Sequence, residues 1–402
     1  MLQSYFRTFK GLSKEVWMLS LVLLINRAGS MVLPFLSVYL HKEIGLSLTD
    51  VGWIMSLYGL GAMTGSYVGG ELTDRFHYFP VMIFSLITSG LGYISLQFAN
   101  GFYSFGFVLF CTVFFADLFR PSSMTAMGAY SKPEDYTRSV SLLRLAINLG
   151  YSLGPAIGGW VAYRLGYIPL FWIDGLTCII AAAAVFLFLK QKDVPKKKKK
   201  SKATKASESP YRDREYLIFI AMVALMALVF MQLLTTLPVY FKDHFEMNED
   251  QIGLLLALNA FLIVLVEMPL IHRLEPRSSK IRMVQIGTFA IGLSYFVFLL
   301  APNWIWVTAI NMVLLSFGEI FAMPFSNAYC MDLTTPENRG KYMALYSMAY
   351  SFAFILAPIL GMQIASTFGF PTLWIILSVI TLLTIFGLGN ILRQAPKKTL
   401  AK

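Results

Sequence analysis

Six ionisable side chains lie inside long apolar stretches of this 402-residue chain, where charge is expensive. An ionisable group near the middle of a bilayer costs roughly 2.5–3.5 kcal/mol on insertion scales. Such groups can pair across helices, carry protons or bind a charged solute. The three bases and three acids balance in charge, and they are Arg27, Arg120, Arg144, Asp117, Glu267 and Glu319.

The acids and bases divide unequally between the halves of the chain. The bases and Asp117 lie in the first half, whereas Glu267 and Glu319 lie in the second with no base at a comparable depth. A carboxyl in an apolar cavity without a nearby cation is favoured in its neutral form, which suits a proton carrier. We therefore rank Glu319 first and Glu267 second. Asp117 is third, because Arg120 is three residues away on the same helix face and can pair with it.

The composition predicts a polytopic, all-α membrane protein. The chain is 57% hydrophobic and 14% charged, with a mean hydropathy of +0.64, whereas soluble domains carry about a quarter charged residues. Apolar runs of about 20 residues recur, each long enough to cross a hydrocarbon core of about 30 Å. Twelve helices are expected, near 15–40, 50–72, 80–99, 103–129, 139–163, 168–189, 214–242, 250–273, 281–301, 304–331, 341–366 and 370–392.

The chain repeats itself after about half its length. Pro121 and Pro155 recur as Pro324 and Pro358, and Gly52 recurs as Gly253. The repeat predicts two pseudo-symmetric six-helix bundles, 1–189 and 214–402, joined by a basic linker at 190–213. In membrane transporters built this way, the solute site lies at the junction of the repeats.

The basic residues predict the orientation. With the amino terminus inside, 27 of the 33 Lys and Arg lie on the cytoplasmic side, which follows the positive-inside rule. We expect a multi-pass protein of the cell (inner) membrane with both termini in the cytoplasm. The net charge of +11 then reflects topology and implies no nucleic acid. The run Lys196–Lys200 predicts a solvated tether near anionic lipid headgroups.

Several other kinds of protein are disfavoured. The three cysteines have unrelated spacings, and the four histidines lie at helix ends or in loops. No metal-ligand cluster, nucleophile–base pair or phosphate-binding loop is apparent, so we expect no metal, no cofactor, no enzymatic activity and no direct use of ATP. No cleavable signal peptide is apparent either.

Three motifs resemble those of the major facilitator superfamily. Gly70-Glu71-Leu72-Thr73-Asp74-Arg75 is similar to its loop signature between the second and third helices. Pro336-Glu337-Asn338-Arg339-Gly340 is similar to its P-E-x-R-G loops. The resemblance implies the major facilitator fold, with Gly70 allowing close helix approach, and Asp74 and Arg75 belonging to a contact that changes between states.

The fifth predicted helix carries the third motif, Gly150-Tyr151-Ser152-Leu153-Gly154-Pro155-Ala156-Ile157-Gly158-Gly159. It matches the G-x-x-x-G-P-x-x-G-G pattern of the drug:proton antiporter branch. Small residues let helix backbones approach closely, and a proline bends a helix. The motif predicts a packed hinge; simple helix packing is the alternative. The hinge residues are Gly150, Gly154, Pro155, Gly158 and Gly159.

Some residues resemble the proton-coupled oligopeptide transporters instead. Glu319 and the run Phe119-Arg120-Pro121 are similar to the tenth- and fourth-helix motifs of that branch, and Arg27 matches an arginine of its first helix. Leu23 and Asn26, however, replace two acids of that motif, which argues against a standard peptide symporter. The resemblance implies that Arg27, Asp117, Arg120 and Glu319 face a central cavity.

The preferred hypothesis is proton-coupled export of amphipathic small molecules, with protons and membrane lipid as the other partners and a monomer as the expected state. The alternatives are import of a zwitterion such as a short peptide, a lipid flippase, and a transporter-shaped receptor. Asp174, near one end of the sixth helix, is set aside. The predicted substrate-binding residues are Arg27, Arg120, Arg144, Asn148, Gln232, Asn259, Asn311 and Tyr329.

Overall fold

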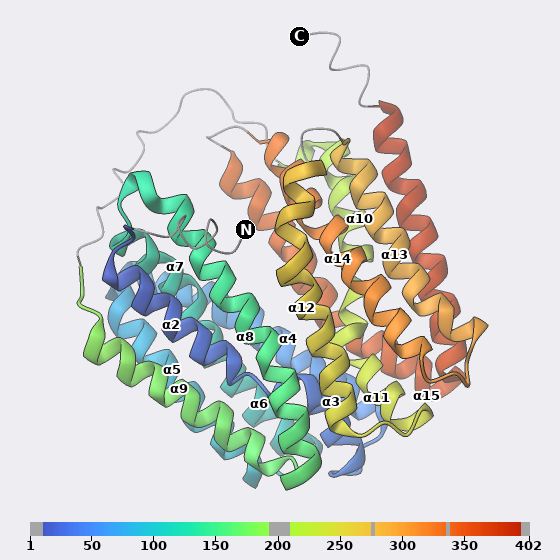
Figure 1. Ribbon diagram of the computed structural model, residues 1–402, viewed down its shortest axis with the longest axis horizontal. Helices are drawn as coiled ribbons and strands as arrows, with labels where there is room; N and C mark the ends of the chain where they lie inside the picture. Colours follow the sequence, from blue (N-terminus) through green and yellow to red (C-terminus); the bar gives the residue numbers. More distant parts are fainter. Residues whose placement is uncertain (1–10, 193–209, 275–277, 335–337, 395–402) are drawn as a thin grey trace. The chain divides into compact units, whose positions relative to one another are not determined.

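The computed structural model describes residues 11–192, 210–274, 278–334 and 338–394 (Figure 1). Within those ranges every regular element is a helix, which confirms the predicted all-α class. The predictions for Lys196–Lys200, Pro336 and Glu337 fall outside the described residues.

The first half contains eight α-helices and two short 3₁₀ helices. They are α2 (Lys14–Ala28), α3 (Val32–Lys42), α4 (Leu48–Phe76), α5 (Tyr78–Ser95), η1 (Leu96–Phe98), α6 (Gly101–Asp117), α7 (Phe119–Tyr130), η2 (Pro133–Asp135), α8 (Tyr136–Leu165) and α9 (Ile168–Phe188). The second half contains η3 (Pro210–Arg212), α10 (Arg214–Phe230), η4 (Met231–Leu234), α11 (Thr236–His244), α12 (Glu249–Leu274), α13 (Lys280–Leu300), α14 (Val307–Asp332) and α15 (Arg339–Gln394).

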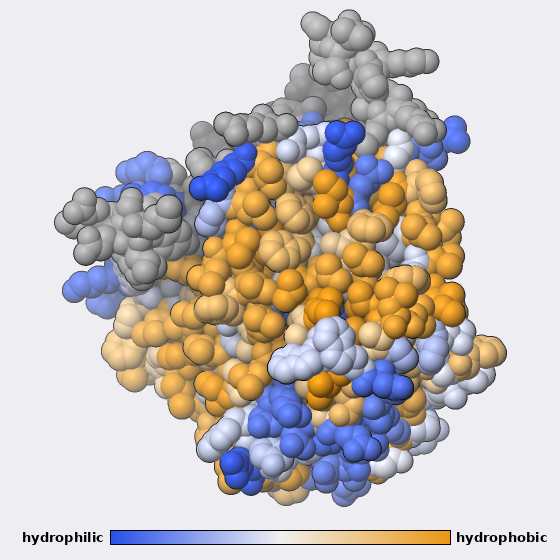
Figure 2. Space-filling view, turned by 45° about the vertical axis from the view of Figure 1, so that its right-hand side comes forward, coloured by the Kyte–Doolittle hydropathy of each residue, from blue (hydrophilic) through white to orange (hydrophobic). Residues whose placement is uncertain are grey.

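Ten helical stretches of the described chain are long and apolar enough to cross a membrane. The last of them, Arg339–Ile391, contains Gly369 at a φ of 81°, where two helices meet. Large apolar side chains such as Phe107, Phe186 and Phe386 are exposed on the helices. Figure 2 shows hydrophobic residues over much of the surface in view, with hydrophilic residues gathered toward its margins. The protein is therefore a multi-pass membrane protein.

Three helices that were expected to be continuous are interrupted. The first breaks between α2 and α3, the seventh passes through η4 between α10 and α11, and the fourth divides at Leu118 between α6 and α7. Apolar periodicity does not reveal these breaks, because a short interruption leaves the composition of a spanning segment unchanged.

Residue contacts divide the chain into two compact units. Unit 1 comprises Met1–Leu46, Leu57–Lys200 and Asn248–Ala257; unit 2 comprises Ser47–Ser56, Ser201–Met247 and Leu258–Lys402. The start of α4 is thus grouped with unit 2, and the start of α12 with unit 1. Each unit therefore includes one short segment from the other half of the sequence.

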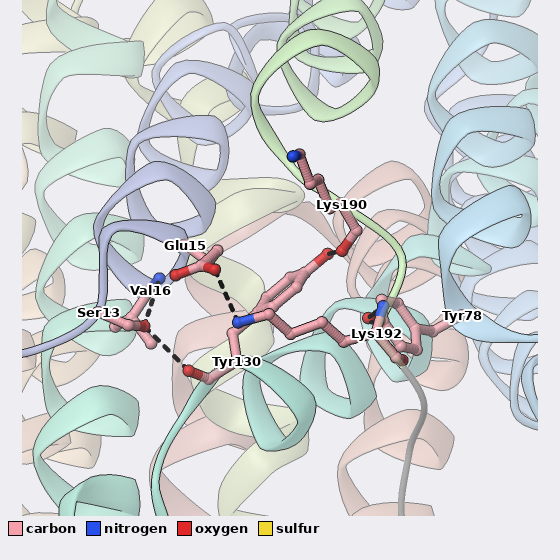
Figure 3. Close-up of polar contacts among 7 residues, drawn as sticks. All are labelled: Ser13, Glu15, Val16, Tyr78, Tyr130, Lys190 and Lys192. Atoms are coloured by element: carbon pink, nitrogen blue, oxygen red, sulfur yellow. Dashed lines mark hydrogen bonds and ion pairs between the residues drawn. The ribbon is translucent and has the colours of Figure 1, made fainter.

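In unit 1 an extended segment, residues 189–192, follows α9 and is fastened to three helix ends (Figure 3). The Tyr130 hydroxyl donates to the Lys190 carbonyl at 2.9 Å, and the Tyr78 hydroxyl accepts from the Lys192 backbone N–H at 3.0 Å. The Lys192 ammonium pairs with the Glu15 carboxylate at 2.7 Å. We call these five residues the linker clamp, because they fasten the first residues of the basic linker.

Removing the clamp hydroxyls is expected to destabilise unit 1. Tyr130→Phe and Tyr78→Phe each leave a backbone group without its partner, which should lower the free energy of unfolding by about 1 kcal/mol. Thermal unfolding in detergent measures the change. Tyr103→Phe is the control, because Tyr103 is 87% exposed. Equal melting temperatures for all three variants would contradict the clamp.

Candidate functional site

In unit 2, the carboxylate of Glu319 on α14 lies beside a short network of neutral polar groups. The Asn259 amide on α12 donates to the Ser316 hydroxyl at 3.1 Å and lies 3.5 Å from Glu319 Oε2. Ser316 donates onward to the Met312 carbonyl at 2.7 Å. In the described chain, no Lys, Arg or His nitrogen lies within 4 Å of the Glu319 carboxylate. Glu319 is half-buried, so its carboxyl lies in a protected setting without an ion-pair partner.

Two further groups extend this cluster. Glu267, half-buried on α12, interacts electrostatically with Glu319. Tyr350 on α15 also interacts with Glu319, and its hydroxyl accepts from Tyr346 at 3.3 Å. We call Asn259, Glu267, Ser316, Glu319 and Tyr350 the Glu319 cluster. The structure thereby brings together three of the predicted residues, Asn259, Glu267 and Glu319, from separate helices.

In unit 1 a second cluster surrounds Arg27 on α2. The guanidinium donates from Nη1 to the Tyr151 hydroxyl on α8 at 3.1 Å and lies 5.5 Å from the ring centroid. The carboxylate of Asp117, at the end of α6, interacts electrostatically with Arg27 and Arg120. We call Arg27, Asp117, Arg120 and Tyr151 the Arg27 cluster.

The expected pairing of Asp117 with Arg120 is not formed. The described residues include no ion pair of Asp117 within 4 Å. The helix is interrupted between the two residues, since α6 ends at Asp117 and α7 begins at Phe119. Leu118 itself has helical dihedral angles, with φ at −59° and ψ at −29°, and the exposed side chain of Arg120 does not come within 4 Å of the Asp117 carboxylate.

The other predicted substrate-binding residues lie elsewhere. Gln232 and Asn311 are fully buried; their amides donate to the Ala357 carbonyl at 3.0 Å and the Ser294 carbonyl at 2.8 Å, so they join helices. The Tyr329 hydroxyl donates to Glu215 at 3.2 Å, near the start of α10. Arg144 is exposed and Asn148 is half-buried, both on α8.

The predicted loop signature lies in the last turns of α4. The expectation that Gly70 permits a close helix approach is wrong, because a Cβ added there would meet nothing within 4 Å. Gly69 makes the approach instead: its added Cβ would lie 2.7 Å from Leu118 Cα. The neighbouring residue fills that role because it faces the break between α6 and α7. Asp74 and Arg75 are exposed.

The glycines of the fifth-helix motif line two faces of α8 in unit 1. Added Cβ atoms would lie 2.6 Å from Arg27 Cβ at Gly150 and 2.9 Å from Met31 Cβ at Gly158. On another face, Gly159 approaches Gly253 of α12, where an added Cβ would lie 3.0 Å from Gly253 Cα. Because all three neighbouring atoms are Cα or Cβ atoms, these positions have no room for a side chain.

The contacts of Pro155 and Pro358 repeat in the two units. A Cβ added at Gly253 would meet the Pro155 carbonyl in unit 1, and one at Gly52 would lie 2.8 Å from the Pro358 carbonyl in unit 2.

In unit 1 the Tyr167 hydroxyl also donates to Glu249 at 2.7 Å. Burial, and then this hydrogen bond, raises the pKa of Tyr167, so its hydroxyl stays a donor.

Asp174 on α9 makes a polar contact that was not predicted from the sequence. Its two carboxylate oxygens accept from the backbone N–H groups of Met31 and Val32, at 2.8 and 3.1 Å. Only 3% of the residue is exposed. The signal that could have identified it is the coincidence of an acid in one apolar segment with Gly29-Ser30 in another.

A family model described as the Major Facilitator Superfamily matches residues 18–334 and 242–401. A Na⁺, Li⁺, K⁺/H⁺ antiporter of Planococcus maritimus is 24% identical, over 94% of this chain and 95% of the relative. The multidrug resistance protein MdtH of Photorhabdus laumondii is 21% identical, over 92% of each.

Solved transporter structures share the fold. The peptide transporter POT in complex with sulfate superposes with a TM-score of 0.80 at 17% identity, covering 95% of this chain and 96% of that one. The nucleoside transporter NupG, in a mutant form, gives a TM-score of 0.79 at 13% identity, covering 94% and 100%. At such identities the likeness concerns the fold alone.

Proposed function

The chain belongs to the major facilitator superfamily of transporters, which are not enzymes, and from that membership we propose that it exports amphipathic small molecules in exchange for protons. The observation that carries the proposal is the setting of Glu319, a carboxyl among neutral polar groups and, in the described residues, without a base within 4 Å. An ion pair would hold a carboxylate ionised. Glu319 can instead gain and lose a proton as its surroundings change.

In this mechanism, protonation and substrate binding act on one equilibrium, the one between the two facing states of the transporter. A protonated Glu319 favours one facing state, and bound substrate favours the other, each by its differential affinity. Glu267 is the second candidate for the proton carrier, because it interacts with Glu319. Asp117, near Arg27 and Arg120, is the third candidate.

We also propose that the protein lies in the cell (inner) membrane as a monomer, with both termini in the cytoplasm.

Reconstituted vesicles test this proposal. Purified protein in proteoliposomes with an imposed pH gradient is expected to move ethidium or norfloxacin in the direction opposite to protons, and to reverse when the gradient is reversed. A protonophore should abolish the movement. Drug flux that is unaffected by Glu319→Gln and Glu267→Gln together would remove the mechanism.

Alkali-cation/proton exchange is a second candidate. The Planococcus relative is named as such an antiporter, and Glu319 and Ser316 offer the oxygen ligands that hard cations prefer. The same vesicles distinguish the two functions. If Na⁺ or K⁺ alone dissipates the pH gradient and neither drug does, cation exchange replaces drug export.

Import of a zwitterion remains the alternative that the Arg27 cluster favours. Arginine suits bidentate capture of a carboxylate, and Arg27 already donates to Tyr151 beside Asp117. Labelled dipeptide uptake that depends on Arg120 would support this reading. Uptake that survives Arg120→Ala would count against it. A lipid flippase is a variant of the export proposal and would move labelled lipid in the same vesicles.

A further inference from the structure

Asp174 caps a helix that begins inside the membrane-spanning part of unit 1. The first N–H groups of any helix lack partners within it. In α3, Val32 N–H and the preceding Met31 N–H donate to the Asp174 carboxylate. Pro34, in the same first turn, has no N–H to satisfy. One side chain from α9 therefore satisfies donors that water cannot reach.

The Asp174 carboxylate has no basic partner in the described chain. No Lys, Arg or His nitrogen lies within 4 Å of it. Three titratable groups interact electrostatically with the Asp174 carboxylate, namely Tyr58 on α4, Tyr93 on α5 and Cys178 on α9. Its charge is stabilised by the two N–H groups and by the positive end of the α3 dipole.

The break between α2 and α3 is held on both sides. Thr177, one turn after Asp174 on α9, packs against Gly29, where an added Cβ would lie 2.6 Å from Thr177 Cβ. On α8, Gly150 packs against Arg27 and Gly154 against the Ser30 carbonyl. The backbone from residue 27 to residue 32 is thus held between α8 and α9.

Arg27 projects from this held backbone toward Tyr151. We infer that Asp174 is a positioning residue for Arg27: by capping α3 it fixes the helix break, and thereby the point at which the guanidinium meets the carboxylate of a transported molecule. The inference rests on the proposed transport function and deepens it, since it adds the residue that sets the geometry of one subsite.

Asp174→Asn is the variant that tests this role. It keeps the size of the side chain, but turns an acceptor oxygen into an NH₂ group that faces a backbone N–H. Thr177→Val is the matched control on the same helix. Valine keeps the shape that packs against Gly29, and the Thr177 hydroxyl donates only to the carbonyls of Ile173 and Asp174 in its own helix. The probe is norfloxacin, an amphipathic drug that carries both a carboxylate and an amine.

We expect Asp174→Asn to raise the KM for norfloxacin about tenfold, as small displacements of a positioning group do, with a maximal rate within about twofold of wild type. Thr177→Val should leave both unchanged. Combined with Arg27→Lys, Asp174→Asn should add little further, because both variants disturb one interaction. A role in stability alone would lower the melting temperature and the maximal rate without this pattern in KM.

Amide hydrogen exchange gives a readout that needs no transport. In Asp174→Asn, exchange over residues 27–32 should quicken relative to wild type and Thr177→Val. An unchanged KM, independent effects of the Asp174 and Arg27 variants, or unchanged exchange would each overturn the inference. If wild type neither binds nor moves norfloxacin, the drug-export proposal fails, and the exchange experiment alone decides whether Asp174 holds the break.

Discussion

Glu319→Gln is expected to abolish proton-driven transport while leaving substrate exchange intact. Glutamine has the shape of the protonated acid but cannot release a proton. Loss of the coupling energy, typically 1–3 kcal/mol between two ligands, should reduce gradient-driven flux by at least about tenfold. Exchange of labelled for unlabelled substrate across the same vesicles needs no net proton movement and should continue.

The control for this variant lies on the same helix. Asp332, at the end of α14, pairs with Lys280 at 2.6 Å and its side chain is 56% exposed, so Asp332→Asn should behave as wild type. Glu319→Gln should also melt close to wild type, because its contact with Asn259 is a long one at 3.5 Å. Normal gradient-driven flux in Glu319→Gln would exclude Glu319 as the proton carrier.

Gly159→Val is expected to cause a second large loss of transport. In unit 1 its added Cβ would lie 3.0 Å from Gly253 Cα and would meet the Glu249 carbonyl, so backbone would have to move. Overpacking of this kind costs about 1–3 kcal/mol. If the contact forms in only one transport state, a cost of about 2 kcal/mol shifts the equilibrium by about thirtyfold. Transport should therefore fall by more than about tenfold.

Gly70→Val provides the comparison for Gly159→Val. Gly70 is also helical and belongs to the same unit, but an added Cβ would meet nothing within 4 Å. Drug flux and the melting temperature should both stay near wild type in that variant. If Gly159→Val transports normally, the approach of α8 to α12 is not required for the transport cycle.

The architecture was largely predictable because spanning segments obey a simple rule. About 20 apolar residues are required to cross a bilayer, and the predicted 168–189 and 281–301 agree closely with α9 and α13. The interruptions were not predictable in the same way. Gly29, Thr235 and Leu118 lie within apolar runs, so the length and composition of a spanning segment do not locate the interruptions.

The candidate site was predictable where the free-energy cost of placing a polar or charged side chain in the membrane is enough to identify a residue. Three polar or charged residues stand out within apolar segments and lie together in the structure, namely Glu319, Glu267 and Asn259. Gln232 and Asn311 satisfied the same criterion and yet join helices through backbone carbonyls. A polar residue needs a partner in the membrane whether it binds a ligand or not, so composition cannot separate these two roles.

Asp174 shows what the pattern of one segment of the sequence cannot predict. Its partners, Met31 and Val32, are about 140 residues away in sequence, and nothing local to α9 announces them. The prediction for Gly70 was wrong for a related reason, since adjacent residues on a helix, such as Gly69 and Gly70, differ by about 100° in direction. Which of the two faces a neighbour depends on the rotation of α4 about its axis.

The matching contacts of Gly253 with Pro155 and of Gly52 with Pro358 bear on how such a chain arose. Each half of the sequence supplies one glycine and one proline to this pair of contacts. A single ancestral half would have carried both parts and could have paired with a second copy of itself. Duplication and fusion would then have made that association independent of concentration, and left each half free to acquire its own charges.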